Sequence, residues 1–341
     1  MAMHDGCGRA IDYLRVSLTD RCNLRCVYCM PEEGVCPLRH EDVLRLEEML
    51  EVVSLAVQRG VTHVRLTGGE PLLRRNVTSF VERVAALPGV EDVSLTTNAT
   101  LLPRFAKGLA AAGLRRVNVS LDTLDPEQYR LITRVGNLKD ALAGIRSAFE
   151  AGLEPVKLNT VVVRSLEQDL FAFAKLTLNA PLHVRFIEYM PLGTEAADPG
   201  LGWTEHDVVP AAEMIERINA AAIAAGVGPL QPIDPLAAHG SEVPLGAGPA
   251  RYCRFPGAQG TVGFISSLSN HFCSSCNRLR LTADGKLRPC LFSDREFDVK
   301  APLRAGNRTA LEAVLDQVLA EKPDEHHHRV GTRRAMSQMG G

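Results

Sequence analysis

The chain has 341 residues, a formal net charge of −2, 45% hydrophobic residues and 23% charged residues. This length predicts two domains, or one large domain with an appendage. The near-neutral charge argues against a nucleic-acid partner, and no run approaches the roughly 18 apolar residues of a membrane span. The first residues lack the charged start and apolar core of a targeting peptide, so we expect a cytoplasmic protein with no membrane partner.

The first two-thirds of the chain alternates β-like runs with amphipathic helical runs. Strands are predicted at Ile11–Leu18, Val61–Thr67, Val90–Thr96, Leu114–Leu121, Glu154–Val163 and Leu182–Met190. Helices are predicted at Glu41–Arg59, Val77–Leu87, Pro103–Ala112, Leu138–Ala151 and Leu166–Leu178. Consecutive βα units predict a parallel sheet with right-handed crossovers. Because eight units close a full barrel, these six predict an α/β fold with an incomplete (β/α)6 TIM-type barrel.

Three cysteines follow the first predicted strand with the spacing C-x3-C-x2-C: Cys22, Cys26 and Cys29. A cubane iron–sulfur cluster usually takes four thiolates, so three thiolates leave one iron open to a small molecule. A structural zinc site needs four ligands, and no histidine lies close in sequence. Disulfides are rare in cytosolic proteins. We therefore predict a 4Fe–4S cluster that acts on a bound ligand.

A second trio, Cys273, Cys276 and Cys290, has the spacing C-x2-C followed by one distant cysteine. Three ligands again favour a 4Fe–4S cluster with an open iron. Zinc remains an alternative here because the nearby His271 would complete a four-ligand set. The other cysteines, Cys7, Cys36 and Cys253, are isolated in the sequence, and the default for each is a packing residue or an incidental thiol.

The predicted strands alternate polar and apolar residues, so their two faces differ. We expect the apolar face to pack on helices and the polar face to line a cationic, hydroxyl-lined cavity, because a dry polar barrel interior is costly. The polar face carries Arg15, Ser17, Thr19, His63, Arg65, Thr67, Arg116, Asn118, Ser120, Asp122, Lys157, Asn159, His183 and Arg185. Alternatively, Arg116, His63 and His183 lie near strand starts and merely reach solvent.

The second predicted strand ends in Thr67-Gly68-Gly69-Glu70-Pro71. Two glycines at this position let the backbone approach a ligand closely, and the carboxyl ends of barrel strands are where such folds keep their sites. Farther along, residues 226–260 are rich in Gly and Pro after a helix predicted near Ala211–Ala225. We therefore predict a linker there, leading to a second, small domain.

These motifs together resemble the radical S-adenosylmethionine (SAM) enzymes, and within them the GTP 3′,8-cyclase family of molybdenum cofactor biosynthesis. The resemblance rests on the segments 18–31 (LTDRCNLRCVYCMP), 65–74 (RLTGGEPLLR), 118–122 (NVSLD), 185–191 (RFIEYMP) and 277–291 (NRLRLTADGKLRPCL). It implies a radical SAM partial barrel with one 4Fe–4S cluster at residues 1–225. It also implies a C-terminal domain with an auxiliary 4Fe–4S cluster and a Gly-Gly tail at residues 226–341.

The resemblance implies that SAM bound at the first cluster is cleaved by one electron into methionine and a 5′-deoxyadenosyl radical. This radical takes a hydrogen from ribose C3′ of GTP, and C3′ then adds to guanine C8, giving (8S)-3′,8-cyclo-7,8-dihydroguanosine 5′-triphosphate. The positions that match the SAM site are Tyr28, Gly69, Ser120 and Met190. The positions that match the GTP site are Arg15, Arg65, Thr96, Lys157, Arg278, Leu279 and Arg280. Several Arg and Lys donors are also what a triphosphate requires.

The resemblance further implies that the terminal Gly340 and Gly341 enter the active site and take part in catalysis. It implies a one-electron reductant, transfer of the product to cyclic pyranopterin monophosphate synthase, and a homodimer. One departure is Ala99, where the family usually has glycine. We predict that His326–His328 is a solvated segment. The alternatives are a radical SAM enzyme that modifies a peptide, and a non-enzyme such as an electron carrier or a zinc scaffold.

Overall fold

The structure is a computed structural model, and it describes residues 3–191, 204–233, 248–326 and 334–340. Its helices are α1 (Leu46–Gln58), α2 (Val77–Ala85), α3 (Leu102–Ala111), α4 (Pro126–Thr133), α5 (Leu138–Glu150), α6 (Leu170–Asn179), α7 (Ala211–Ala224), α8 (Lys300–Arg304), α9 (Arg308–Ala320) and α10 (Met336–Met339). The first eight strands are β1 (Met3–His4), β2 (Ala10–Ile11), β3 (Tyr13–Ser17), β4 (His63–Thr67), β5 (Asp92–Thr97), β6 (Arg116–Ser120), β7 (Lys157–Val162) and β8 (His183–Glu188). The later strands are β9 (Gln231–Pro232), β10 (Arg251–Arg254), β11 (Thr261–Ile265), β12 (Arg278–Leu281), β13 (Lys286–Arg288) and β14 (Phe297–Asp298).

All six predicted strands are present, as β3 to β8, and they pair in chain order as neighbouring parallel strands. The five helices predicted between the strands are present as α1, α2, α3, α5 and α6, and the helix predicted near Ala211–Ala225 is present as α7. The sequence analysis missed α4, although its start carries two helix signals. Pro126 occupies the first turn, and the side chain of Asp125 accepts a hydrogen bond from the Gln128 amide at 2.7 Å.

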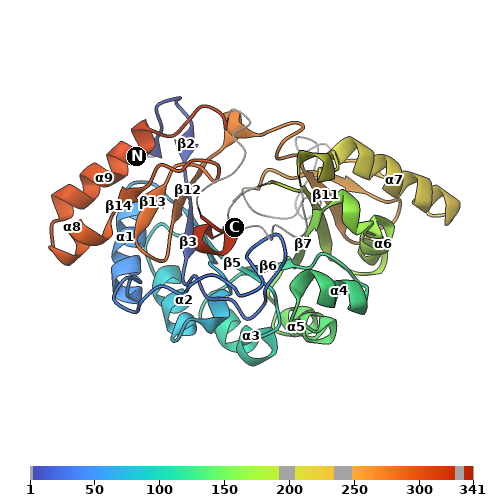
Figure 1. The fold of residues 1–341 in the computed structure, drawn as a ribbon, viewed down its shortest axis with the longest axis horizontal. Helices are drawn as coiled ribbons and strands as arrows, with labels where there is room; N and C mark the ends of the chain where they lie inside the picture. Colours follow the sequence, from blue (N-terminus) through green and yellow to red (C-terminus); the bar gives the residue numbers. More distant parts are fainter. Residues whose placement is uncertain (1–2, 192–203, 234–247, 327–333, 341) are drawn as a thin grey trace.

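The sheet continues beyond the six predicted strands at both edges. Strand β12 adds parallel to β3, and β11 adds parallel to β8. The full order is β14-β13-β12-β3-β4-β5-β6-β7-β8-β11-β10-β9, with β13, β14, β10 and β9 paired antiparallel. Figure 1 shows the resulting arch, with helices along its outer side and the carboxyl terminus inside it. The barrel is therefore incomplete, as predicted.

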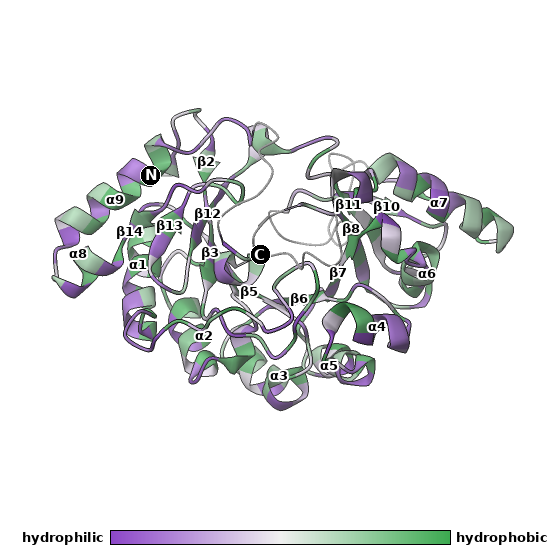
Figure 2. Ribbon diagram, in the orientation of Figure 1, coloured by the Kyte–Doolittle hydropathy of each residue, from purple (hydrophilic) through white to green (hydrophobic). Residues whose placement is uncertain are grey.

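The apolar face of the strands packs against the outer helices. Val16, Leu66, Leu95, Val119 and Val184 are all fully buried in one core cluster. The surrounding helices carry both hydrophilic and hydrophobic stretches (Figure 2), as expected for helices with one buried face. This arrangement leaves the other face of each strand directed into the arch.

The segment predicted as a linker, 226–260, contains β9 and β10, and its residues 234–247 lie outside the described part of the chain. Strands on both sides of residue 225 belong to one sheet. A division into domains at this residue therefore stays a prediction. None of the described helices is long and apolar enough to cross a membrane.

Candidate active site

One cavity inside the arch brings together most of the predicted site residues. All six cysteines of the two trios line it. The four residues predicted for SAM also line it: Tyr28, Gly69, Ser120 and Met190. Five of the seven residues predicted for GTP do so: Arg15, Arg65, Thr96, Arg278 and Arg280. Segments from both ends of the chain thus meet at the carboxyl side of the parallel strands.

The Gly-Gly turn after β4 packs against the backbone that leads into the first cysteine loop. The Gly69 amide donates to the Thr19 carbonyl at 2.8 Å, and the Glu70 amide donates to the Arg21 carbonyl at 2.8 Å. A Cβ atom on Gly69 would lie 2.3 Å from the Arg21 oxygen, which is too close for any side chain. Gly69 is therefore required for the close approach of the two loops, and it also lines the cavity.

Glu70 links this turn to the next strand end. It is 1% exposed and accepts hydrogen bonds from Thr97 Oγ1 and from the Asn98 amide, both at 2.8 Å. Burial raises its pKa to about 7, although these hydrogen bonds act in the opposite direction. The Asn98 side chain in turn donates to Asn23 Oδ1 at 2.9 Å. This network ties the loop between Cys22 and Cys26 to the ends of β4 and β5.

The thiols of the first trio lie in a low-dielectric environment. Burial raises the pKa of Cys22 to about 11 and that of Cys29 to about 12, and it raises the pKa of Cys26 as well. Between them, Tyr28 donates a hydrogen bond to Asp122 at 2.7 Å, and burial raises the pKa of Asp122 to about 6. Without a metal these thiols stay protonated at neutral pH, whereas an iron ligand is a thiolate.

Arginines form a row across three neighbouring strands on the wall of the cavity. In the sheet register Arg280 of β12 is paired with Arg15 of β3, and Arg15 is paired with Arg65 of β4. Burial lowers the pKa of each of these arginines, and neighbouring arginines lower those of Arg15 and Arg280 further. Crowded buried cations are costly unless an anion joins them. The cavity is therefore suited to a polyanionic ligand.

Arg185 also lines this cavity, but the sequence analysis did not assign it to a ligand. Its place on the polar face of the predicted strand at Leu182–Met190 is the signal that identifies it as a candidate. Several buried polar atoms on the cavity wall have no hydrogen-bond partner among the described residues: Thr96 Oγ1, Arg185 Nε and Arg278 Nε. Buried donors of this kind normally have partners, so they mark positions where a ligand would bind.

Two residues predicted for GTP lie outside the cavity lining. The side chain of Leu279 is 1% exposed and belongs to the main hydrophobic core, so only its backbone could meet a ligand. Lys157 is 2% exposed, and its pKa is lowered to about 5 by burial and by the charges of Arg185, Arg116 and Arg65. Lys157 could therefore affect a ligand only electrostatically, through its interaction with these arginines.

Three residues of the predicted polar face, Arg116, His183 and Lys157, do not line the cavity. All three are buried, so the alternative that Arg116 and His183 reach solvent is wrong. Arg116 is 2% exposed and forms a bidentate pair with Asp92, with bonds of 3.0 and 2.6 Å. His183 is buried, and its Nδ1 lies 2.8 Å from Thr261 Oγ1. These residues, like Lys157, lie where the strands begin. The polar face therefore has two parts. At the strand starts its side chains are buried against one another, and toward the carboxyl ends of the strands its side chains line the cavity.

The second trio is assembled from separate segments. Cys273 begins a short 3-10 helix (Cys273–Ser275), Cys276 follows it, and Cys290 comes after β13. Burial would raise the pKa of Cys276, but the charges of Lys322 and Arg278 outweigh burial and lower it. The pKa of Cys273 is raised by burial. The two trios thus differ in their electrostatic surroundings.

The spacing of the thiols tests whether they suit a cluster. Ligand sulfurs around one zinc ion lie about 3.8 Å apart, since Zn–S bonds are about 2.3 Å in tetrahedral geometry. Among the described residues, neither cysteine trio forms a group with its ligand atoms all within 4.8 Å. Wider sets of three thiolates fit a polynuclear iron–sulfur cluster better than a single ion. A zinc site made by either trio alone is disfavoured.

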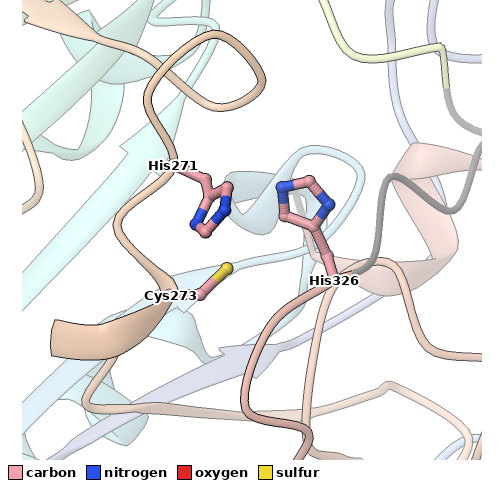
Figure 3. A group of neighbouring side chains, drawn as sticks. All are labelled: His271, Cys273 and His326. Carbon is pink, nitrogen blue, oxygen red and sulfur yellow. The ribbon is translucent and has the colours of Figure 1, made fainter.

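A compact group is formed instead by His271, Cys273 and His326, whose ligand atoms all lie within 4.8 Å (Figure 3). Their side chains point toward one another, and the His326 ring stacks on Phe292. The Cys273 thiol could not hold a single ion here and also bind a cluster with Cys276 and Cys290. His326 is 5% exposed, so the prediction of a solvated segment is wrong for this residue. His327 and His328 lie outside the described residues.

The carboxyl-terminal tail reaches the arginine row. The Gly340 carbonyl accepts a hydrogen bond from Arg280 Nη1 at 2.8 Å. Gly340 has φ +69°, and a Cβ atom there would lie 2.8 Å from Thr67 Cγ2. Upstream, Arg334 pairs with Asp284 at 2.8 Å and so anchors α10. Gly340 therefore contacts the arginine row, whereas Gly341 lies outside the described residues, so the entry of the tail into the active site stays a prediction.

Comparisons with known proteins agree over the whole chain. The Radical SAM superfamily matches residues 16–176, and the family Molybdenum Cofactor Synthesis C matches residues 182–328. The GTP 3′,8-cyclase of Pelotomaculum thermopropionicum is 54% identical over 343 residues, which cover 99% of this chain and 100% of the relative. The GTP 3′,8-cyclase of Moorella thermoacetica is 51% identical, with the same coverage.

Solved structures support the fold. A structure described as native anSMEcpe with bound AdoMet aligns with a TM-score of 0.58 at 15% identity, covering 93% of this chain and 82% of the other. SuiB of Streptococcus suis bound to S-adenosylmethionine aligns with a TM-score of 0.57 at 13% identity, covering 90% and 68%. At these identities the likeness concerns the fold alone.

Proposed function

This chain belongs to the GTP 3′,8-cyclase family of molybdenum cofactor biosynthesis, whose members are radical SAM enzymes, and we propose how its residues divide the reaction. The observation that carries the proposal is the shared cavity, which both cysteine trios and the arginine row line together. SAM binds at the first trio, and GTP binds between the arginines and the second trio. The non-enzyme alternatives and the peptide-modifying alternative do not account for the arginine row.

Cys22, Cys26 and Cys29 would hold a 4Fe–4S cluster, which would supply the electron for the cleavage of SAM. Around it, Gly69 offers a wall without a side chain, and Ser120 and Met190 line the same part of the cavity. Tyr28 is held in place by its 2.7 Å hydrogen bond to Asp122. Together these residues orient SAM so that its 5′ carbon faces the nucleotide, because radical transfer requires contact distance.

Arg15, Arg65 and Arg280 bind the triphosphate. Guanidinium groups form charge-assisted, often bidentate hydrogen bonds with phosphate oxygens. Arg185 adds positive potential at the cavity wall, and Thr96 Oγ1 donates to the nucleotide. Lys157, whose pKa is about 5 in the free protein, gains a proton as the phosphates offset the charges of the neighbouring arginines. The like charges that are crowded in the free protein make binding of an anion more favourable.

The reaction balances with two electrons and one proton. The first electron cleaves SAM to methionine and the 5′-deoxyadenosyl radical, which takes the hydrogen atom from ribose C3′. The C3′ radical adds to guanine C8, and a second electron and a proton complete the dihydro product at the ring nitrogen. Cys273, Cys276 and Cys290 would hold the auxiliary 4Fe–4S cluster, whose open iron would bind the guanine. The terminal pair Gly340 and Gly341 takes part in catalysis, which the contact of the Gly340 carbonyl with Arg280 supports.

Three partners belong to the same proposal. The electrons come from a one-electron reductant, and the cyclised nucleotide passes to cyclic pyranopterin monophosphate synthase. The protein acts as a homodimer.

The test is an anaerobic incubation of the reconstituted protein with GTP, SAM and a strong reductant, followed by mass analysis. We expect 5′-deoxyadenosine and a nucleotide of GTP mass that no longer behaves as GTP on chromatography. GTP deuterated at C3′ should deliver its deuterium to 5′-deoxyadenosine. SAM cleavage without deuterium transfer would contradict the proposed geometry, and the absence of cleavage would contradict the assignment of the first trio.

A further inference from the structure

Lys322 lies just beyond α9 and is buried, with 5% of its surface exposed. Its Nζ lies 3.5 Å from Cys276 Sγ, 3.0 Å from the Arg278 carbonyl oxygen and 2.8 Å from the Pro289 carbonyl oxygen. An ammonium group has three N–H donors, so these three acceptors use all of them. Of these three acceptors, the sulfur of Cys276 is the one that can carry the opposite charge.

These contacts join the two parts of the second trio. Arg278 follows Cys276 at the start of β12, whereas Pro289 directly precedes Cys290. One buried ammonium group therefore fixes the backbone beside two of the three cysteines. Because both carbonyls are also directed at it, moving either segment would leave a buried polar group without a partner, which is costly.

A second cation braces the remaining cysteine from the other end of the chain. Arg9 Nη1 donates to the Cys273 carbonyl at 2.7 Å and to the Asp324 carbonyl at 2.9 Å. Arg9 Nη2 donates to the Pro323 carbonyl at 2.6 Å. Since Pro323 and Asp324 directly follow Lys322, Arg9 holds in place the segment that carries the lysine.

The sulfurs of the first trio have different donors. Cys22 Sγ lies 3.4 Å from the Leu24 amide nitrogen and 3.9 Å from Asn98 Nδ2, and both of these donors are neutral. The group of Ser337 that acts on Cys29 is its backbone amide, which is also neutral. A charged donor directed at a ligand sulfur is therefore seen at Cys276 and not at these two cysteines.

We propose that Lys322 is a positioning and charge-balancing residue of the second cluster, which raises the reduction potential of that cluster through its hydrogen bond to Cys276. The inference rests on the proposed function in one respect, that the second trio holds a cluster. Hydrogen bonds to the sulfurs and the local net charge are established controls of cluster potential. A cation favours the reduced form because that form carries one more negative charge.

The test uses the full-length chain with Cys22, Cys26 and Cys29 replaced by Ala, so that only the second cluster is reconstituted. Lys322→Met removes the charge at nearly constant length, and Lys322→Arg keeps it. The matched control is Lys300→Met, whose Nζ contacts the Asp42 carbonyl at 3.2 Å on a different part of the C-terminal region. Iron and sulfide content and the midpoint potential, from a titration followed by electron paramagnetic resonance, are measured without GTP or SAM.

We expect Lys322→Met to lower the midpoint potential at nearly full cluster content, with Lys322→Arg close to the parent and Lys300→Met unchanged. A parental potential in Lys322→Met would overturn the proposal. If Lys322→Met does not assemble a cluster, Lys322→Arg decides between the two roles. An assembled cluster with the parental potential in Lys322→Arg supports the role of the charge. Loss of the cluster in Lys322→Arg as well would mean that Lys322 acts only through its shape, which would refute the proposal. Since no substrate is present, these outcomes are independent of whether GTP is cyclised.

Discussion

The two cysteine trios line one cavity, but the first comes from one short segment of the chain and the second from segments that are far apart in sequence. The first occupies eight consecutive residues, Cys22 to Cys29, and is supported by the neighbouring Gly-Gly turn and by Asn98. The second draws on the loop at Cys273, the segment at Cys290, the buried Lys322 and, from the other end of the chain, Arg9. Local sequence thus determines the first trio, whereas the tertiary fold determines the second.

The two trios also differ in the electrostatic surroundings of their thiols. Burial dominates at the first trio and raises the pKa of each of its thiols. At Cys276 the nearby cations outweigh burial and lower the pKa. Among the described residues the donors to the Cys22 sulfur are neutral, although Arg25 donates to the Cys22 carbonyl at 2.6 Å. A sulfur without a charged donor keeps a cluster more strongly reducing, which the cleavage of a sulfonium bond requires. A site with cations suits a cluster that binds an electron-rich ring, so the comparison assigns each trio its own task.

The largest effect should come from exchanging one cysteine in each trio. Cys26→Ala should abolish SAM cleavage, whereas Cys276→Ala should abolish GTP cyclisation and leave uncoupled SAM cleavage measurable. Iron content should fall by about half in each variant, since each trio holds one cluster. The assays are 5′-deoxyadenosine formation and chromatographic separation of the cyclised nucleotide from GTP, with mass analysis of each peak, on the same reaction. Equal loss of cleavage in both variants would contradict the division of tasks.

Removal of Gly340 and Gly341 should come next in size. Neither residue has a side chain to pack, so the melting temperature should hardly change. The reaction should lose most cyclised product per SAM cleaved, because Arg280 loses its contact with the Gly340 carbonyl and the radical pair is less well oriented.

A sharper version of the tail experiment is Gly340→Ala. This change brings a Cβ atom to within 2.8 Å of Thr67 Cγ2 at a backbone angle that favours glycine, so it should displace the tail without shortening it. Ser274→Ala, at an exposed position in the second cysteine loop, is the matched control and should keep full coupling. Full coupling in the truncated chain would show that the tail has no catalytic role.

The arginine row should give effects of intermediate size. Arg15→Ala should weaken GTP binding by about 1.5–3 kcal/mol, or roughly 10- to 150-fold, because it removes a charge-assisted contact. Guanosine should bind poorly to the parent and respond little to the change. Arg116→Ala is a useful contrast, since its pairing with Asp92 predicts loss of stability instead. Equal losses for guanosine and GTP in Arg15→Ala would assign Arg15 to the fold.

The same contrast between local and distant determinants explains what the sequence could predict. Alternating residues predicted all six strands, and compact spacing predicted the first trio, because both patterns act over a few residues. The row of Arg280, Arg15 and Arg65 needed the pairing of β12 with β3, which joins segments more than 250 residues apart. No local pattern indicated that β11 and β12 would extend the two edges of the sheet, or that Lys322 would contact Cys276.

The misplaced residues follow from the same limit. Alternation correctly placed Lys157 on the inner face, but it cannot tell how far along the barrel axis a residue lies, and Lys157 is buried outside the cavity lining. Leu279 was matched by its motif position although its side chain belongs to the apolar face. Arg116 was recognised as polar, while its partner Asp92 is on a different strand and could not be identified from sequence.

The smallest predicted effect concerns a proton at Lys157. In the folded chain its pKa lies near 5, against an ordinary value of 10.5, because it is buried beside Arg185, Arg116 and Arg65. Between these two values the unfolded chain holds a proton that the native chain lacks. This group therefore makes the stability of the ligand-free protein rise with pH across that window. Lys157→Met should remove this part of the pH dependence.

Binding of a triphosphate should reverse the local balance of charge at Lys157. The phosphates offset the charges of the arginines, so the pKa of Lys157 should rise and GTP should bind with uptake of up to one proton near pH 7. Calorimetry in two buffers of different ionisation enthalpy measures this uptake directly. Lys175→Met, at an exposed position on α6, is the matched control and should take up as much as the parent. Lys157→Met should take up less, because it removes the group that titrates. If Lys157→Met binds GTP with the parental proton uptake, the proton goes to the nucleotide or to another side chain, and Lys157 has no electrostatic link with the bound phosphates.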